Sequence, residues 1–265
     1  MSKNFELLRR AGQAEVLFYR PRCDRLPDAG GRIQADREIA RGEIAKAEND
    51  GVLRREPDLT QDETAKLVQR VFVFSNSHAP RVVVFSSADE RTGSGEICFR
   101  AGEILAAQRL GSVCLVDANL RAPSLHQMSG VAKSPGLTDA TVKPGPIRDF
   151  GVQVVGSNLW IVPPGSSEAT AQGLYASGPL RLRIGELRRE FDYVLIDAPP
   201  VSSCGDAVLL GQMADGVILV VEANSTRRET ARLAKETFEG AEIRLLGGVL
   251  NNRKFPIPEA LYRTL

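Results

Sequence analysis

The fold of this chain is decided by the stretch VVVFSSADERTGSGEICFRAGEILAA, residues 82–107. The uniformly apolar run Val82–Phe85 predicts a buried strand, because a strand of a parallel sheet is covered on both faces. Glycines at positions 93 and 95 predict a tight turn after it. One face of a helix follows, formed by Ile97, Ala101, Ile104 and Leu105. The stretch therefore predicts a strand, a glycine turn and a helix, the order that a phosphate-binding loop requires.

The same alternation continues through the rest of the chain. Five further apolar runs predict buried strands: Val113–Val116, Leu159–Val162, Tyr193–Ile196, Val217–Val221 and Leu245–Leu250. Two more helical faces lie between them, the first with Leu180, Ile184 and Leu187, the second with Thr230, Leu233, Ala234 and Phe238. Alternating strands and helices predict an α/β fold with a doubly wound, mostly parallel sheet and helices on both faces. Ligands of such sheets bind at the carboxyl ends of the strands.

The loop after the first strand is the first candidate site element. Gly93, Ser94 and Gly95 would let backbone N–H groups wrap around a phosphate at the start of the helix. In a working phosphate-binding loop, a lysine follows the last glycine and a Mg²⁺-binding serine or threonine follows the lysine. With Gly95 as the last glycine, Glu96 takes the lysine position and Ile97 takes the serine/threonine position.

The charge of this loop opposes a polyanion. Against one base, Arg91, stand three acids: Asp89, Glu90 and Glu96. At about 4 Å, replacing an attractive contact by a repulsive one shifts a charge pair by several kcal/mol even at an effective dielectric constant of about 20. The alternative interpretation is a tight strand-to-helix connection that binds no phosphate.

A carboxylate closes the second strand in VCLVDANLRAPSLH, residues 113–126. Burying Asp117 is costly unless the carboxylate has a partner. In an ATP site, that partner is Mg²⁺ or its bound water, and the carboxylate can also accept a proton from an attacking hydroxyl. The alternatives are a helix N-cap and an ion pair with Arg121.

Two later strand ends complete the candidate site. Asp197 closes the strand of FDYVLIDAPPV, residues 191–201, as a Walker B carboxylate does when it holds the water shell of the metal. Asn251, at the end of the last strand, carries a donor and an acceptor suited to the edge of adenine, although a turn-forming asparagine is the alternative. Asp206 is expected to cap the helix that follows it.

Composition excludes several classes of protein. The 265 residues are 43% hydrophobic and 25% charged, as is usual for a globular protein. A net charge of +1 gives no electrostatic case for nucleic acid as a partner. The sequence has no apolar run near the ~20 residues of a bilayer crossing and no apolar signal-peptide region, so we expect a cytoplasmic protein. The four widely spaced cysteines are expected to be unpaired thiols.

Residues 1–60 differ from the remainder in composition and in residue pattern. They are expected to be a charged, partly flexible N-terminal segment, and residues 61–265 a nucleotide-binding domain. A short helix is predicted near the start, with one face formed by Phe5, Leu8, Ala11 and Leu17. A docking arm for a partner is the alternative interpretation of this segment.

The two aspartate motifs carry a resemblance to a known family. VCLVDANLRAPSLH resembles the Walker A′ element, and YVLIDAPPV the Walker B element, of the CpsD/CapB-type bacterial tyrosine kinases of capsule and exopolysaccharide synthesis. These kinases are relatives of the P-loop ATPases of the MinD/ParA type. The similarity extends over residues 63–265, through GLTDA (136–140), ADGVILVVEANSTRRET (214–230) and GGVLNNRKFPIPEALYRTL (247–265).

The resemblance implies ATP and Mg²⁺ as cofactors and a membrane polysaccharide co-polymerase as the activating partner, which would recruit the protein to the inner face of the membrane. It implies Asp117 as the catalytic, metal-linked carboxylate, Asp197 as the Walker B carboxylate and Gly93–Ile97 as a degenerate phosphate loop. A ring-like homo-oligomer is also implied.

Several family features are missing from this sequence. The loop lacks the lysine and the serine/threonine, and Asn119 replaces the second acid of the Walker A′ element. The C-terminal tyrosine cluster is reduced to Tyr262, and the ring-forming Glu-x-x-Arg-x-x-Arg pattern remains only as Glu63, Lys66 and Gln69, with Arg70 adjacent.

These features leave three hypotheses. The first is a regulator of polysaccharide assembly and export with weak or lost tyrosine kinase activity. The second is an active autokinase with a rewired phosphate loop. The third is a MinD/ParA-like positioning ATPase, although the tail PEALYRTL is short and weakly basic for membrane targeting.

Overall fold

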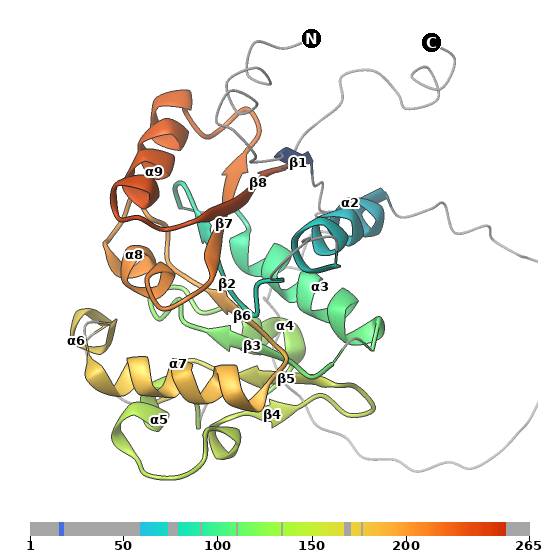
Figure 1. Ribbon diagram of the computed structural model, residues 1–265, viewed down its shortest axis with the longest axis vertical. Helices are drawn as coiled ribbons and strands as arrows, with labels where there is room; N and C mark the ends of the chain where they lie inside the picture. The colour runs from blue at the N-terminus through green and yellow to red at the C-terminus, as the bar shows by residue number, and fades with distance from the viewer. Residues whose placement is uncertain are drawn as a thin grey trace, which may run out of the picture.

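A single sheet organises the computed structural model, which describes residues 16–18, 59–73, 79–90, 92–109, 111–133, 135–166, 171–175 and 177–252. The sheet has eight strands in the order β1-β8-β7-β2-β6-β3-β5-β4 (Figure 1). Neighbouring strands are parallel except for the antiparallel pair β4 and β5. The strands are β1 (Val16–Phe18), β2 (Val82–Ser87), β3 (Val113–Asp117), β4 (Val152–Gln153), β5 (Leu159–Val162), β6 (Tyr193–Asp197), β7 (Gly216–Glu222) and β8 (Leu245–Asn251).

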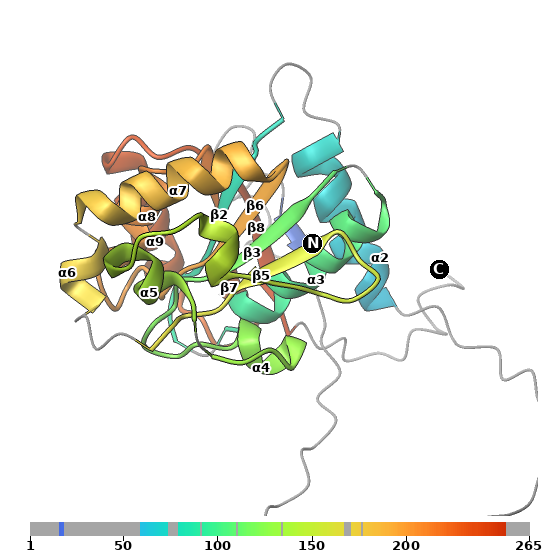
Figure 2. The same cartoon turned by 90° about the horizontal axis from the view of Figure 1, so that it is seen from below.

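Helices cover both faces of this sheet. The helices α7, α8 and α9 lie on one face and α2, α3 and α4 on the other (Figure 1, Figure 2). The helical segments are α2 (Leu59–Val68), η1 (Gln69–Val73), α3 (Ser94–Ala107), α4 (Leu125–Ser129), α5 (Leu137–Val142), η2 (Ile147–Phe150), α6 (Ala171–Tyr175), α7 (Gly178–Glu190), α8 (Asp206–Gly211) and α9 (Arg228–Gly240). The predicted doubly wound α/β fold and its six predicted strands are confirmed.

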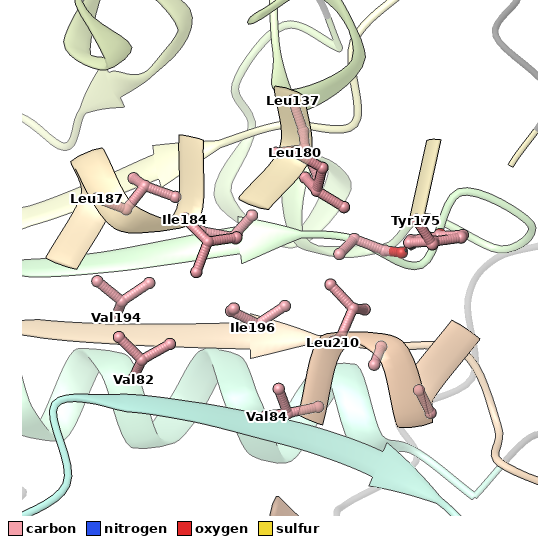
Figure 3. Packing of buried hydrophobic residues seen from close by; sticks show 14 of the residues in the cluster. Val82, Val84, Leu137, Tyr175, Leu180, Ile184, Leu187, Val194, Ile196 and Leu210 are labelled. Atoms are coloured by element: carbon pink, nitrogen blue, oxygen red, sulfur yellow. Dashed lines mark hydrogen bonds between the residues drawn. The ribbon is translucent and has the colours of Figure 1, made fainter. Parts of the chain in front are cut away.

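The two-residue period of the strands decides which face each side chain enters. Val82 and Val84 of β2 point to the cluster that contains Ile184 of α7 (Figure 3). Val83 and Phe85 lie in the opposite cluster, with α2 and α3. In β3 and β6 the same alternation directs the last residue of each strand toward the face that α3 and α4 cover, since Leu115 and Leu195, two residues earlier, belong to that cluster.

Three expectations need correction. The pattern at the start of the chain predicts Leu17 on a helix, but Val16–Phe18 form β1, whose backbone pairs with the free edge of β8. Leu233 of α9 is predicted in the core, but it is 64% exposed, because Ala234 and Phe238 alone carry the buried stripe of that helix. The antiparallel β4 is not predicted at all, since two residues are too short to give a period.

Other expectations for the N-terminal half lie mostly outside the described residues. Apart from β1, the first described residue is Leu59, where α2 begins, and the predicted domain boundary at residue 60 stays a prediction. On α2, Lys66 Nζ lies 2.7 Å from Glu63 Oε1. Over the ranges that the structure describes, no helix combines the length and apolar character needed to cross a membrane.

Candidate functional site

Two carboxylates meet at the centre of the carboxyl edge of the sheet. Strands β3 and β6 are neighbours, and their register places Asp117 directly beside Asp197. Both side chains are fully buried. The sequence predicts a carboxylate at the end of each strand, and the strand order brings the two together.

One oxygen of Asp117 is held and the other is free. Oδ2 accepts a hydrogen bond from the backbone N–H of Leu125 at 3.0 Å and lies 3.4 Å from His126 Nδ1. Oδ1 has no hydrogen-bond partner in the described part of the chain. Leu125 is the first residue of α4, so the carboxylate does serve the start of that helix, as one alternative expected. The expected ion pair with Arg121 is wrong, because the Arg121 guanidinium lies 3.6 Å from Asp206.

Asp197 has the same division of its two oxygens. Oδ1 accepts a hydrogen bond from Ser94 Oγ at 3.2 Å. Oδ2 is buried without a hydrogen-bond partner among the residues described. The site therefore presents two unpaired carboxylate oxygens, one from each neighbouring strand.

Burial and mutual repulsion shape the electrostatics of this pair. Burial raises the pKa of Asp197 well above its ordinary value, and the charge of Asp117 raises it further. Burial also raises the pKa of Asp117, while the contacts with His126 and Leu125 lower it. The pKa of the buried Cys98 thiol is raised by burial and then by both carboxylates, so Cys98 stays a neutral thiol. A bound cation would relieve the repulsion between the carboxylates.

The glycine turn is followed directly by α3. Gly93 has a left-handed φ of 77° and caps α3, so the helix begins at Ser94. The sequence places Glu96 opposite a phosphate, but it lies further along the first turn of the helix, and its carboxylate is 2.9 Å from Arg100. Ile97 is predicted at the Mg²⁺-binding position, but its side chain is buried in the core beneath α3.

Gly95 is the position of the loop that backs onto the carboxylates. A Cβ atom placed there would collide with Ser124 Oγ and lie 3.1 Å from Asp197 Oδ2. The two residues that face Asp197 from the start of α3 are therefore Ser94, through its hydroxyl, and Gly95, through its lack of a side chain.

Asn251 contacts the loop directly. Its Nδ2 atom donates a hydrogen bond to the carbonyl of Thr92 at 2.7 Å. A Cβ atom on Gly93 would lie 2.7 Å from the same Nδ2 atom, so the amide and the left-handed glycine fit against each other. Asn251 Oδ1 and Thr92 Oγ1 are buried, and neither has a hydrogen-bond partner among the described residues. The amide donor is thus engaged by the loop, and adenine binding by Asn251 stays a prediction.

The donor set fits a hard divalent cation better than it fits a phosphate. Mg²⁺ is usually held by one or two carboxylates and completes its shell with water. The unpaired oxygens of Asp117 and Asp197, with the Ser94 hydroxyl beside them, match that requirement. No cluster of three or more His, Cys, Asp or Glu side chains able to hold a metal occurs in the described ranges. From residue 92 to residue 99 the loop and helix start contain no lysine or arginine to pair with a phosphate.

Two contacts of the site could not be found from spacing. His126 stands within the quoted Walker A′ stretch, but no periodicity indicates that its ring turns back to Asp117. Thr226 Oγ1 donates to Asp89 Oδ1 at 3.1 Å and so connects the glycine loop to the segment after β7.

Asp206, expected as a helix cap, is instead the first residue of α8, and Gly205 takes the cap position.

Comparison with known proteins finds relatives that are bacterial tyrosine kinases. It is 29% identical over 151 residues to the tyrosine-protein kinase YwqD of Bacillus subtilis, covering 57% of this chain and 64% of that kinase. It is 28% identical over 166 residues to the tyrosine-protein kinase CpsD of Streptococcus agalactiae, covering 61% and 70%. The chain thus spans less than two thirds of the first of these relatives. No protein-family model matches it.

Solved structures share its fold. The chimerical protein CapA2B2 superposes with a TM-score of 0.70 at 21% identity, covering 77% of this chain and 88% of that one. At this identity the likeness establishes the fold, a P-loop NTPase type of α/β sandwich.

Proposed function

Because these relatives support assignment of the chain to the CpsD/CapB-type bacterial tyrosine kinases, we propose that it is a cytoplasmic regulator of exopolysaccharide or capsule assembly and export with weak or lost ATP-dependent tyrosine kinase activity. One observation carries the proposal. In the buried Asp117–Asp197 pair, two oxygens have no hydrogen-bond partner among the described residues, while the loop beside the pair has no lysine.

The position of the glycine turn relative to the start of α3 explains why phosphate binding would be weak and not abolished by repulsion. With Gly93 as the last glycine of the turn, Ser94 takes the lysine position and Gly95 the serine/threonine position. Glu96 is neutralised by Arg100 and does not oppose a phosphate. With Glu96 paired to Arg100, the loop keeps one net negative charge in place of two, from Asp89 and Glu90 against Arg91.

The residues that would hold Mg²⁺ are Asp117 and Asp197, with the Ser94 hydroxyl acting for the missing serine/threonine. When bound with a nucleotide, the ion supplies charge neutralisation to the phosphates. The chain itself contributes Asp117 Oδ1, which is unpaired and can accept a proton from a hydroxyl group at the strand ends.

The partner that we propose is a membrane polysaccharide co-polymerase, which would bring this protein to the inner face of the membrane. The name of one relative, the succinoglycan biosynthesis transport protein ExoP of Rhizobium meliloti, which is 29% identical to this chain over 178 residues, supports a role in polysaccharide export. Assembly of copies through α2 is a further part of the proposal, since Glu63 and Lys66 of the partial ring pattern lie on that helix.

A second candidate function is an active tyrosine autokinase with a rewired loop. Two contacts favour it: the Ser94 hydroxyl reaches the Walker B carboxylate, and Glu96 is turned onto Arg100. In that case, backbone N–H groups at the start of α3 would supply the phosphate contacts that the lysine usually provides.

Titration of the purified chain with Mg·ATP tests the proposal. We expect a Kd in or above the range of about 0.1–1 mM, together with no phosphotyrosine. Ser94→Lys should tighten binding severalfold, because a hydrogen bond to a charged group contributes about 1.5–3 kcal/mol and outweighs the about 0.5–1.5 kcal/mol of the Ser94 hydroxyl that the substitution removes.

Glu96→Lys is the comparison variant: it places a lysine at the position that faces Arg100, and although it changes the net charge by two where Ser94→Lys changes it by one, it should gain much less. Equal gains by the two variants would mean that the loop register is wrong. Micromolar binding with phosphotyrosine formation by the unmodified chain would replace this proposal by the second candidate.

A further inference from the structure

The imidazole of His126 lies against the held oxygen of Asp117. Its Nδ1 atom is 3.4 Å from Oδ2, the oxygen that also accepts the Leu125 N–H, and Oδ1 on the other side has no partner within the described residues. An ionised carboxylate can only accept hydrogen bonds. The contact therefore requires the proton of a neutral imidazole to sit on Nδ1.

The ring is held in this place by its own turn. Ser129 Oγ donates to the carbonyls of Leu125 and His126, at 2.8 and 3.2 Å, and so closes the short helix α4. The Leu125 side chain is fully buried in the core under α3. His126 itself keeps only 12% of its side chain exposed. The histidine thus comes from a braced turn and has little freedom to leave Asp117.

The two carboxylates of the site are held in complementary ways. Ser94 binds Oδ1 of Asp197 from α3, while Leu125 and His126 bind Oδ2 of Asp117 from α4. What remains unpaired is one oxygen from each, on strands that are in register. Without His126, only the Leu125 N–H would hold Oδ2, and the Asp117 carboxylate could turn more freely about its Cβ–Cγ bond, with an entropy cost on binding a cation.

We propose that His126 is a positioning residue for a divalent cation: its Nδ1–H fixes Asp117 Oδ2 so that Oδ1 faces the ion that Asp197 shares. The inference rests on the metal-dependent site of the proposed function. It assigns to the histidine a role that acts through Asp117, with no direct bond to the ion.

Two substitutions at position 126 distinguish the roles of the two ring nitrogens. His126→Asn places an amide N–H near the Nδ1 position, and His126→Gln reaches the Nε2 position. Mn²⁺ titration of the full chain, followed by electron paramagnetic resonance of the free ion, measures affinity without activity. We expect His126→Gln to weaken Mn²⁺ binding by about 10- to 100-fold, the usual effect of removing an outer-shell partner, and His126→Asn to retain most of the affinity.

The outcomes distinguish this inference from the proposed function. If the unmodified chain binds no Mn²⁺, the proposed metal site and the positioning role both fail, while a regulator that has lost its kinase activity stays compatible with the result. If it binds Mn²⁺ and neither variant changes the affinity, the positioning role alone is overturned. If Gln retains the affinity and Asn loses it, Nε2 is the required atom, and direct ligation replaces positioning.

A measurement on the unmodified chain remains decisive should the variants fail to fold. Nitrogen NMR of ¹⁵N-histidine-labelled protein at neutral pH should show the His126 ring protonated on Nδ1. A ring protonated on Nε2 would contradict the inference.

Discussion

At the scale of the single residue, Asp197 is kept at a cost to stability. Its pKa is raised by burial and by the neighbouring charge of Asp117, so the folded state binds this proton more tightly than the unfolded chain does. Stability therefore falls as the pH rises from the ordinary carboxyl range through the raised pKa. This arrangement is typical of functional sites, where binding is retained at the expense of stability.

Asp197→Asn should consequently stabilise the fold while it abolishes Mn²⁺ binding. We expect a higher melting temperature at pH 7, by about 2–4 °C for each kcal/mol gained, and a difference that shrinks as the pH is lowered toward about 4. Thermal unfolding followed by circular dichroism over this pH range measures the effect.

Asp192→Asn is the control of opposite sign. Hydrogen bonds from Ser112 lower the pKa of Asp192, so its contribution to stability is present at neutral pH and is lost as the pH falls through the lowered pKa. We expect this variant to be less stable at pH 7 and to approach the parent chain in acid. A destabilised Asp197→Asn at pH 7 would contradict the assignment of a repulsive carboxylate pair.

At the scale of the element, the turn between β2 and α3 depends on one glycine and one amide. Gly93 is in the left-handed region, and Asn251 from the end of β8 packs against it while binding the Thr92 carbonyl. An alanine at this position meets both backbone strain and the amide nitrogen.

Gly93→Ala is therefore expected to lower stability by more than the roughly 1–2 kcal/mol of left-handed strain alone. Gly156→Ala is the matched control, because Gly156 has a φ of 76° and a Cβ atom added to it would have no other atom within 4 Å. Urea unfolding should rank the parent chain first, Gly156→Ala second and Gly93→Ala last. Equal losses in the two variants would show that the contact with Asn251 contributes nothing.

At the scale of the whole molecule, the fold buries one tyrosine, Tyr175, and half-buries another, Tyr193. Tyr175 is fully buried, and its hydroxyl donates to the carbonyl of Ala118. Tyr193 begins β6, four residues before Asp197 and so roughly 13 Å from it, and its ring contacts Phe72 edge to face. The remaining tyrosines, Tyr19 and Tyr262, lie outside the described residues.

A promiscuous tyrosine kinase added to the folded chain should therefore spare Tyr175. Mass spectrometry of tryptic peptides locates the phosphate, and the heat-unfolded chain, in which Tyr175 becomes accessible, is the control. Any phosphotyrosine that the chain forms by its own activity is likewise expected at a position other than Tyr175. Phosphate on Tyr175 of the folded chain would contradict the burial described for it.

Local sequence was enough to specify six of the eight described strands, the fold class and the two carboxylates at strand ends. A run of apolar residues specifies a buried strand, and a charged residue at its end needs no distant partner to be recognised. The motif resemblance also identified the kinase family that the relatives support.

Which groups meet depends on the tertiary structure. No local period in the sequence predicts several of the features described: the helix start at Ser94, the turn of His126 toward Asp117, the contact of Asn251 with Thr92 and the pairing of β1 with β8. The glycine loop shows the reason most clearly. With Gly93 in the left-handed conformation, α3 begins at Ser94, two residues before Glu96. The group at the helix start that faces Asp197 is therefore the Ser94 hydroxyl. The left-handed Gly93 packs against Asn251 of β8, more than 150 residues away in the sequence. The spacing of residues along the chain does not contain this information.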